Sequence, residues 1–261
     1  MHIGKRHKSL VDGIDVMSMR SDHSFPRHTH EEFSIGVMIA RGHECWCCKG
    51  LVDVQAGDVI GINPGELHDG IGAKGKPRAW HMVTVSQDAI EELIDGRAES
   101  AEFLAPVFQD PQAAALVRST VEGAVHTDGQ PEELKQQLRL VFDRLLRPKD
   151  EAAQCCTTSA NIDLILEQIH SDWAEDLTLE ELARNAGLSK FKALRSFSAA
   201  VGTTPYAYLI QHRINRARDM MLQGICPSEA AVAAGFSDQS HMTRAFKRQI
   251  GLTPMRYVNG S

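Results

Sequence analysis

The sequence lacks any run of about 18 consecutive apolar residues, the length that a helix needs to span a bilayer. Its first 20 residues also lack the apolar block of a secretory signal. There is no glycine-rich phosphate loop, and no arrangement of residues demands a serine or cysteine nucleophile. We therefore expect a cytoplasmic protein with no membrane segment, no cofactor and no enzyme activity.

The length and the charge distribution both divide the chain. With 261 residues it is too long for one small module and suits two domains, each with its own core. The net charge is −6, yet residues 178–261 hold 11 Lys and Arg against 5 Asp and Glu, a net +6. The remaining residues then carry −12. A basic end on an acidic protein is typical of a domain that binds phosphates.

Residues 22–86 read as short strands separated by glycine. Phe33, Ile35 and Val37 alternate in one run, and Asn63-Pro64-Gly65 is a strong turn signal. This pattern predicts a β-barrel or sandwich. From about Gln87 the pattern becomes helical, so the fold class expected for the whole chain is α+β with two domains.

The clearest helix of the first half is predicted over residues 131–147, with Pro131 at its first position. Its apolar residues recur at spacings of 4, 3 and 4: Leu134, Leu138, Val141 and Leu145. Such a seam packs either against its own barrel or against the same helix of a second subunit in a homodimer. The sequence leaves both alternatives open.

Residues 148–160 lack an apolar face and are the best linker candidate. The expected division is a barrel domain in residues 1–147, this linker, and a helical domain in residues 161–261.

A helix-turn-helix is predicted after residue 176. Asp176 or Thr178 can cap its first helix, Gly187 ends that helix, and Ser189 caps the second, which runs from residue 190 to about 200. Leu194 and Phe197 are the expected packing residues of this second helix.

A second unit repeats the first with an offset of 49 residues, from Phe197 to Phe246. Residues 228–234 form its first helix, Gly235 makes the turn, and Ser237 is expected to cap a second helix that packs through Met242 and Phe246. A helix over residues 205–222, about 27 Å long, joins the units. That length suits recognition helices that lie ~34 Å apart on successive major-groove segments.

The residues expected to meet DNA lie on the two second helices, where cationic and polar side chains reach phosphates and base edges. They are Lys190, Phe191, Lys192, Arg195, Gln239, Ser240, Thr243, Arg244 and Lys247.

Several motifs together resemble the AraC/XylS family of regulators. They are Ala183 with Gly187, Leu188-Ser189, Arg195 with Phe197, Gly202 with Pro205-Tyr206, Arg213, Ala217, Gly235-Phe236-Ser237-Asp238-Gln239-Ser240, Arg244 with Phe246-Lys247, and Gly251-Leu252-Thr253-Pro254. The resemblance implies a monomeric unit that reads adjacent major grooves of double-stranded DNA and activates transcription through contacts with RNA polymerase. Pro227 and Ala230 depart from the larger aliphatic residues usual there, and predict a shorter or looser first helix in the second unit.

The barrel segment resembles the cupin-like sensor domains that accompany such DNA-binding halves. His28, His30 and Glu32 are expected on one face of one strand, with His68 on another. We expect these four residues to line a small-molecule effector site. A three-histidine zinc or iron site from His28, His30 and His68 is the weaker alternative. The glutamate usual in metal-binding cupins is missing, because Ser34 and Ile35 stand at its positions.

Cysteines supply one more alternative. Cys45, Cys47 and Cys48 invite a thiol or metal sensor, although strand alternation would bury Cys45 and Cys47 together as small hydrophobes. Cys155-Cys156 falls in the expected linker. The sequence therefore predicts an effector-controlled transcriptional regulator, with a metal-dependent cupin enzyme or a thiol sensor, each carrying a DNA-binding appendage, as the competing hypotheses.

Overall fold

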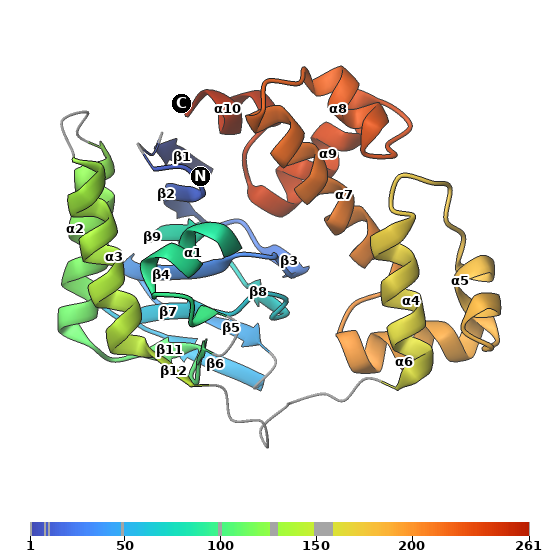
Figure 1. The fold of residues 1–261 in the computed structure, drawn as a ribbon, viewed down its shortest axis with the longest axis horizontal. Coiled ribbons are helices and arrows are strands. Elements are labelled where there is room, and N and C mark those ends of the chain that lie inside the picture. Colours follow the sequence, from blue (N-terminus) through green and yellow to red (C-terminus); the bar gives the residue numbers. More distant parts are fainter. Residues whose placement is uncertain are drawn as a thin grey trace. The chain divides into compact units, whose positions relative to one another are not determined.

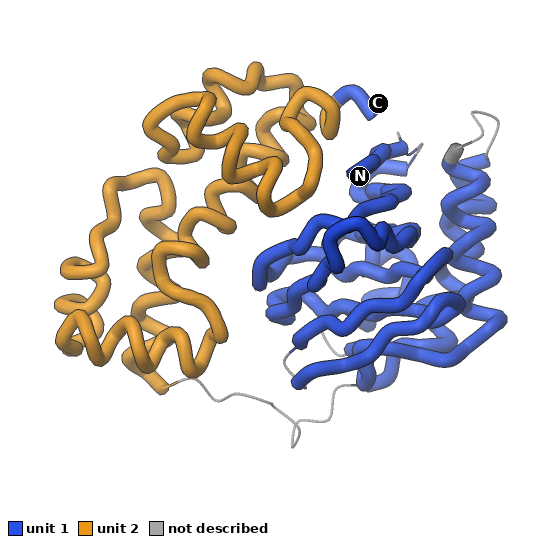
Figure 2. Tube along the Cα trace, turned by 180° about the vertical axis from the view of Figure 1, so that it is seen from behind, with its two compact units in different colours: residues 1–153, 259–261 blue, residues 154–258 orange. Residues whose placement is uncertain are grey.

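A computed structural model of the chain describes residues 2–7, 9, 11–47, 50–98, 101–125, 130–148 and 159–260. The chain forms two compact units, residues 1–153 with 259–261, and residues 154–258 (Figure 2). The first is rich in strands and the second is helical, which confirms the α+β class (Figure 1). Most of the expected linker, residues 149–158, lies outside the described residues.

The described strands of the first unit form antiparallel sheets. The six-stranded sheet has the order β1 (His2–His7), β2 (Ile14–Ser21), β9 (Arg78–Val85), β4 (Phe33–Ala40), β7 (Val59–Ile62) and β11 (Val107–Phe108). The four-stranded sheet has the order β3 (Phe25–His28), β8 (His68–Gly70), β5 (His43–Cys47) and β6 (Gly50–Val54). A two-stranded sheet pairs β10 (Ala101–Phe103) with β12 (Leu146–Pro148).

Strands begin earlier than the sequence predicts. β1 and β2 precede residue 22, and β10 and β11 interrupt the stretch read as helical. β1 contains three His or Lys residues and an Arg but few apolar ones, so apolar alternation did not reveal it. It lies at the edge of its sheet, where charged side chains are usual.

Two apolar cores stabilise this unit. The smaller one joins the two larger sheets through buried Met38 of β4, Cys45 of β5 and Val54 of β6. The larger one lies between the six-stranded sheet and helices α1 (Gln87–Leu93), α2 (Pro111–Val125) and α3 (Pro131–Leu145). β4 is buried along most of its length because it faces both cores, which explains its nearly continuous apolar sequence.

The seam of α3 packs inside its own unit. All four of its predicted residues are buried in the larger core: Leu134, Leu138, Val141 and Leu145. Of the two alternatives that the sequence left open, packing against the unit's own barrel is therefore the one observed. On the outer face of α3, Leu140 is 51% exposed.

Within residues 159–260, the second unit forms the helices α4 (Ala160–Ser171), α5 (Leu179–Asn185), α6 (Lys190–Val201), α7 (Pro205–Leu222), α8 (Pro227–Ala233), α9 (Gln239–Ile250) and α10 (Pro254–Asn259). One core, built on Ile165, Ala193 and Phe197, joins α4, α5, α6 and the start of α7. Near the other end of α7, its residues Ile214 and Met221 are buried. The 18-residue α7 confirms the predicted connecting helix.

Within the described ranges of both units, no helix is long and apolar enough to cross a bilayer.

Truncating the α3 seam should destabilise the first unit. We expect Leu138→Ala to lower the free energy of unfolding by about 2 to 5 kcal/mol, because it leaves a cavity in a closed core. Leu140→Ala on the outer face is the matched control and should change it by less than about 0.5 kcal/mol. Urea unfolding followed by circular dichroism measures both, and equal losses would contradict this packing.

Candidate nucleic-acid interface and effector site

The first helix-turn-helix consists of α5 and α6, and local caps fix where each helix begins. The Thr178 hydroxyl accepts a hydrogen bond from the Glu181 N–H at 3.2 Å, and the Glu181 carboxylate accepts one from the Thr178 N–H at 3.0 Å. The Ser189 hydroxyl accepts from the Lys192 N–H at 3.4 Å. These caps confirm the sequence prediction, with Thr178 rather than Asp176 at the first helix.

Helix α6 buries one face and exposes the other. Ala193 and Phe197, four residues apart, are fully buried. The predicted packing role of Leu194 is wrong: it is 37% exposed, because it lies about 100° further round the helix than Ala193. The four candidate DNA contacts of this helix are all exposed: Lys190, Phe191, Lys192 and Arg195.

The second helix-turn-helix consists of α8 and α9. The predicted cap Ser237 is wrong by one residue, since the Asp238 carboxylate accepts the His241 N–H at 2.7 Å. A carboxylate is the stronger acceptor at a helix N-terminus. Met242 and Phe246 are fully buried, as predicted.

The candidate contacts of α9 lie mostly on its open face. Gln239, Ser240, Arg244 and Lys247 are exposed, and Thr243 is half-buried. Of the two alternatives for the first helix of this unit, shorter or looser, the shorter helix is wrong, because α8 has seven residues, as α5 has.

Neither recognition helix carries an acidic residue. α6 contributes Lys190, Lys192 and Arg195, and α9 contributes Arg244, Lys247 and Arg248. Lys190 pairs with Glu180 of α5, but both side chains are solvated, so a phosphate can compete for the ammonium. The two exposed faces are thus cationic and suited to a nucleic-acid backbone.

A buried arginine of the connecting helix holds the two helix-turn-helices together. The Arg213 guanidinium donates from Nε to the Trp173 carbonyl at 2.7 Å and from a terminal nitrogen to the Glu175 carbonyl at 2.7 Å. Both carbonyls belong to the loop before α5. On its other side, Arg213 contacts the α8–α9 turn, where a Cβ added at Gly235 would lie 3.0 Å from its guanidinium carbon. The sequence contains Arg213 but gives no sign of these distant contacts.

In the first unit, the structure brings the three candidate histidines together. The ring centroids of His28 and His68 lie 4.3 Å apart, and that of His30 lies 4.9 Å from His68. The prediction that His28, His30 and Glu32 share one strand is wrong, because β3 ends at His28. The Gly65 N–H of the predicted turn donates to the His30 carbonyl at 2.8 Å, which brings the 29–32 loop to the start of β8.

Strand register places these rings on the inner face of the four-stranded sheet. His28 pairs with His68, and His68 pairs with Cys47, so the three side chains project to the same face. Cys47 is two residues from Cys45, which packs in the core between the sheets. The histidine cluster therefore faces the interior of the barrel.

Each histidine of the cluster is anchored through Nδ1. The Nδ1 atoms of His28, His30 and His68 lie 2.8, 3.0 and 2.9 Å from the carbonyl oxygens of Pro26, Glu32 and Glu66. Glu32 thus contributes its backbone to the cluster. Burial, with His30 as a second cause, lowers the pKa of His28 to about 4, and burial also lowers the pKa of His68.

The cysteines of β5 behave as buried apolar groups. Cys45 and Cys47 are both buried, as strand alternation predicts. Burial raises the pKa of the Cys45 thiol to about 12, which removes the thiolate that a redox or soft-metal sensor would use. Cys48, Cys155 and Cys156 lie outside the described residues.

Sequence reasoning missed a buried cation on β9. Arg78 is 3% exposed and donates to the carbonyls of His23 and Gly70 at 3.1 and 3.0 Å. Its guanidinium carbon lies 5.0 Å from the ring centre of Trp80, a cation–π contact. The sequence pattern of the strand does not show whether the arginine side chain lies on the buried or the exposed face.

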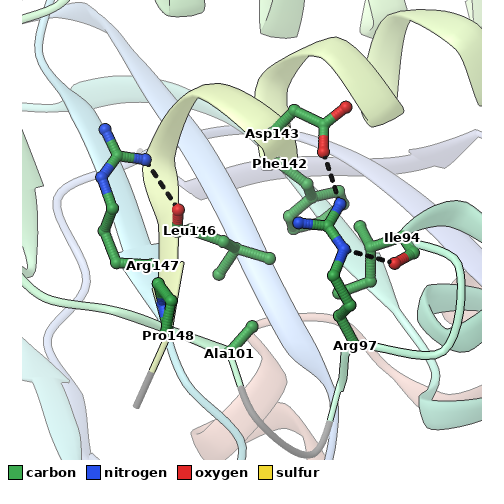
Figure 3. Close-up of a pocket in the computed structure, with 8 residues that line it drawn as sticks. All are labelled: Ile94, Arg97, Ala101, Phe142, Asp143, Leu146, Arg147 and Pro148. Atoms are coloured by element: carbon green, nitrogen blue, oxygen red, sulfur yellow. Dashed lines mark hydrogen bonds and ion pairs between the residues drawn. The ribbon is translucent and has the colours of Figure 1, made fainter. Parts of the chain in front are cut away.

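Two other features do not define a site. Among the described residues, no group of three or more His, Cys, Asp or Glu is arranged to hold a metal ion, so the three-histidine metal alternative gains no support from the geometry. A small pocket near the end of α3 measures about 70 Å³, well below the ~300 Å³ of a typical ligand site (Figure 3). It is lined by Ile94, Arg97, Ala101, Phe142, Asp143, Leu146, Arg147 and Pro148.

The fold and these sites define a two-unit protein in which a β-rich unit of sensor type accompanies a paired helix-turn-helix. Residues 16–186 match the family described as the AraC-like ligand binding domain, and residues 182–260 match a helix-turn-helix domain family. The chain therefore belongs to the AraC family of transcriptional regulators, with a ligand-binding domain and a DNA-binding domain.

Curated relatives agree over most of the chain. It is 31% identical over 226 residues to the uncharacterized HTH-type transcriptional regulator YbfI of Bacillus subtilis, covering 84% of this chain and 81% of the relative. It is 24% identical over 252 residues to the regulator YdeC of the same organism, covering 89% and 85%.

Solved structures of ToxT from Vibrio cholerae share the fold. One is 12% identical, covers 95% of this chain and 98% of ToxT, and has a TM-score of 0.54. Another, of ToxT with a bound unsaturated fatty acid, is 11% identical with a TM-score of 0.54, covering 99% of this chain and 95% of ToxT.

The contact at Gly235 predicts a steric cost in the second unit. An added Cβ would lie 2.8 Å from the Ala174 carbonyl oxygen, and the φ of +75° is itself unfavourable for alanine. We expect Gly235→Ala to destabilise the unit by about 1 to 3 kcal/mol. Gly224→Ala, at a φ of +94° but with open space around it, is the control for backbone strain alone. Equal losses of stability for the two variants, measured by thermal unfolding, would contradict the predicted contact at Gly235.

The depressed pKa values predict a pH dependence of stability. Between pH 6.5 and about 4 the unfolded chain binds a proton at His28 that the folded chain does not, so stability falls as the pH drops through this window. Denaturant unfolding at pH 7 and pH 5 should show this loss, and His28→Asn should reduce it. An unchanged slope in the variant would show that His28 titrates normally.

Proposed function

We propose that this chain binds a specific pair of DNA boxes through α6 and α9, and that a small molecule in the first unit controls this binding. The observation that carries the proposal is the pair of exposed helix faces without acidic residues, each on a capped helix-turn-helix. Their packing through α7 supports recognition of two successive major-groove segments.

The nine candidate contact residues remain our proposal for the interface. Arg195 and Arg244 occupy corresponding positions 49 residues apart and are both exposed, so each suits bidentate contact with a guanine edge. Phe191, at 88% exposure, suits apolar contact with a thymine methyl group. The lysines serve phosphates.

For the effector, we propose the barrel interior at His28, His30, Glu32 and His68. An effector bound there changes the population of chains able to engage both boxes. The bound unsaturated fatty acid is a ligand of ToxT, with which this chain shares its fold at 11% identity.

Activation through contacts with RNA polymerase, a cytoplasmic location and the absence of enzyme activity complete the proposal. They rest on the family resemblance and on the lack of catalytic motifs in the sequence. A homodimer through residues 131–147 would use the outer face of α3 around Leu140, because the seam is occupied within its own unit.

The test begins with selection of genomic DNA by the full-length protein at near-physiological salt. On the selected site, Arg195→Ala should weaken binding by about 1 to 3 kcal/mol and relax the preference at one base position. Arg147→Ala removes the same charge from an exposed residue of the first unit and is the matched control. An unchanged affinity for Arg195→Ala, or failure to select any motif, would contradict the proposal.

A further inference from the structure

In the histidine cluster, Nδ1 of His28 and of His68 faces a backbone carbonyl, and this arrangement leaves Nε2 of each ring as a hydrogen-bond acceptor. The ligand must therefore supply donors. We infer that the barrel receives an effector group that donates hydrogen bonds, a hydroxyl or a neutral amine, to Nε2 of His28 and His68. This inference rests on the proposed effector site and adds the chemical class of the molecule that it binds.

The tautomers follow from the anchoring bonds. The Nδ1 atoms of His28 and His68 face carbonyl oxygens at 2.8 and 2.9 Å. A carbonyl oxygen can only accept, so Nδ1 carries the proton in both rings. In a neutral imidazole the other nitrogen, Nε2, then has an unprotonated lone pair and accepts.

Two imidazolium charges side by side on the inner face of the sheet would repel each other, which favours the neutral form of both rings. The ring centroids lie 4.3 Å apart and both residues are half-buried, so one ligand can reach both rings. A buried acceptor without a donor costs free energy, and a ligand that donates to Nε2 removes that cost.

A carboxylate fits this cluster poorly, because its oxygens would meet acceptors. Two arginines of the sheets, Arg27 on β3 and Arg78 on β9, are already engaged. Arg78 donates to two backbone carbonyls, and Arg27 lies 3.5 Å from the Asp69 carboxylate and over the Trp46 ring. Exchange of these contacts for a ligand carboxylate would leave buried carbonyls unsatisfied or Asp69 without its cation. The geometry therefore favours an alcohol or amine over an acid.

The first test reads the tautomers directly in the full-length protein without DNA. Long-range ¹H–¹⁵N correlation spectra at pH 7 should show Nδ1 protonated and Nε2 unprotonated in His28 and His68. Protonation of Nε2 in either ring, or an imidazolium, would overturn the inference. Because no DNA is present, the result is independent of whether the chain reads a specific site.

The second test uses matched probes, benzyl alcohol and aniline, both neutral at pH 7, against benzoate. The alcohol or the amine should shift the Nε2 resonances of both rings at millimolar concentration, and benzoate should not. A response to benzoate alone, a response to none of the three, or stabilisation by Zn²⁺ alone would overturn the inference.

A variant of His68 can remove the Nε2 acceptor and keep the hydrogen bond to the Glu66 carbonyl. In His68→Asn the amide nitrogen can still donate to the Glu66 carbonyl, but no group replaces Nε2. We expect binding of the alcohol or amine to weaken about tenfold, which corresponds to one lost hydrogen bond. His43→Asn, on β5 outside the cluster, is the control and should bind as the parent does. Equal binding by both variants would contradict the role of His68.

Discussion

Arg213 is buried within the connecting helix α7, and the arrangement of the DNA-binding unit depends on it. A guanidinium that is 6% exposed carries a large desolvation cost, which its two 2.7 Å bonds to backbone carbonyls offset. Those carbonyls lie in the loop that leads into the first helix-turn-helix, while Gly235 of the second packs against the same side chain. One residue of α7 thus contacts both helix-turn-helices, and this shared contact links the two exposed cationic helices through α7.

In the sensing unit, backbone contacts bring the residues of the site together. The turn at Asn63-Pro64-Gly65 is bonded to the 29–32 loop, and this contact brings His30 beside His68, which begins β8. Backbone carbonyls then accept a hydrogen bond from Nδ1 of each ring. The polarity of the site is therefore set by main-chain geometry, so that the same histidines on a differently shaped loop would present donors. Burial keeps His28 and His68 neutral and preserves this polarity at physiological pH.

How much of the structure the sequence could predict depends on how far apart along the chain the interacting residues lie. Caps act over three residues, so Ser189 was predicted and the first cap was narrowed to Asp176 or Thr178, and the 49-residue repeat revealed both helix-turn-helices. Ser237 and Leu194 were wrong by one position, within the ambiguity of local patterns. The bonds of Arg213 span 40 and 38 residues and leave no local trace. In the sensing unit, the fold brings the three predicted histidines together. The premise that His28 and His30 share one strand is wrong, because β3 ends before His30. The polar strand β1 and the burial of Arg78 were not predicted, because the alternation of apolar and polar residues reveals only strands with an apolar face.

The most direct test of the account is the dependence of affinity on the spacing of the two DNA boxes. Once the full-length protein has selected its site, about five base pairs, half a helical turn, are inserted between the boxes, and binding is compared with the parent site and with a single box. If Arg213 fixes the two recognition helices in one arrangement, the insertion should reduce affinity to that of the single box. Equal affinity for the parent and the expanded site would show that the helix-turn-helices act independently, and would contradict the account.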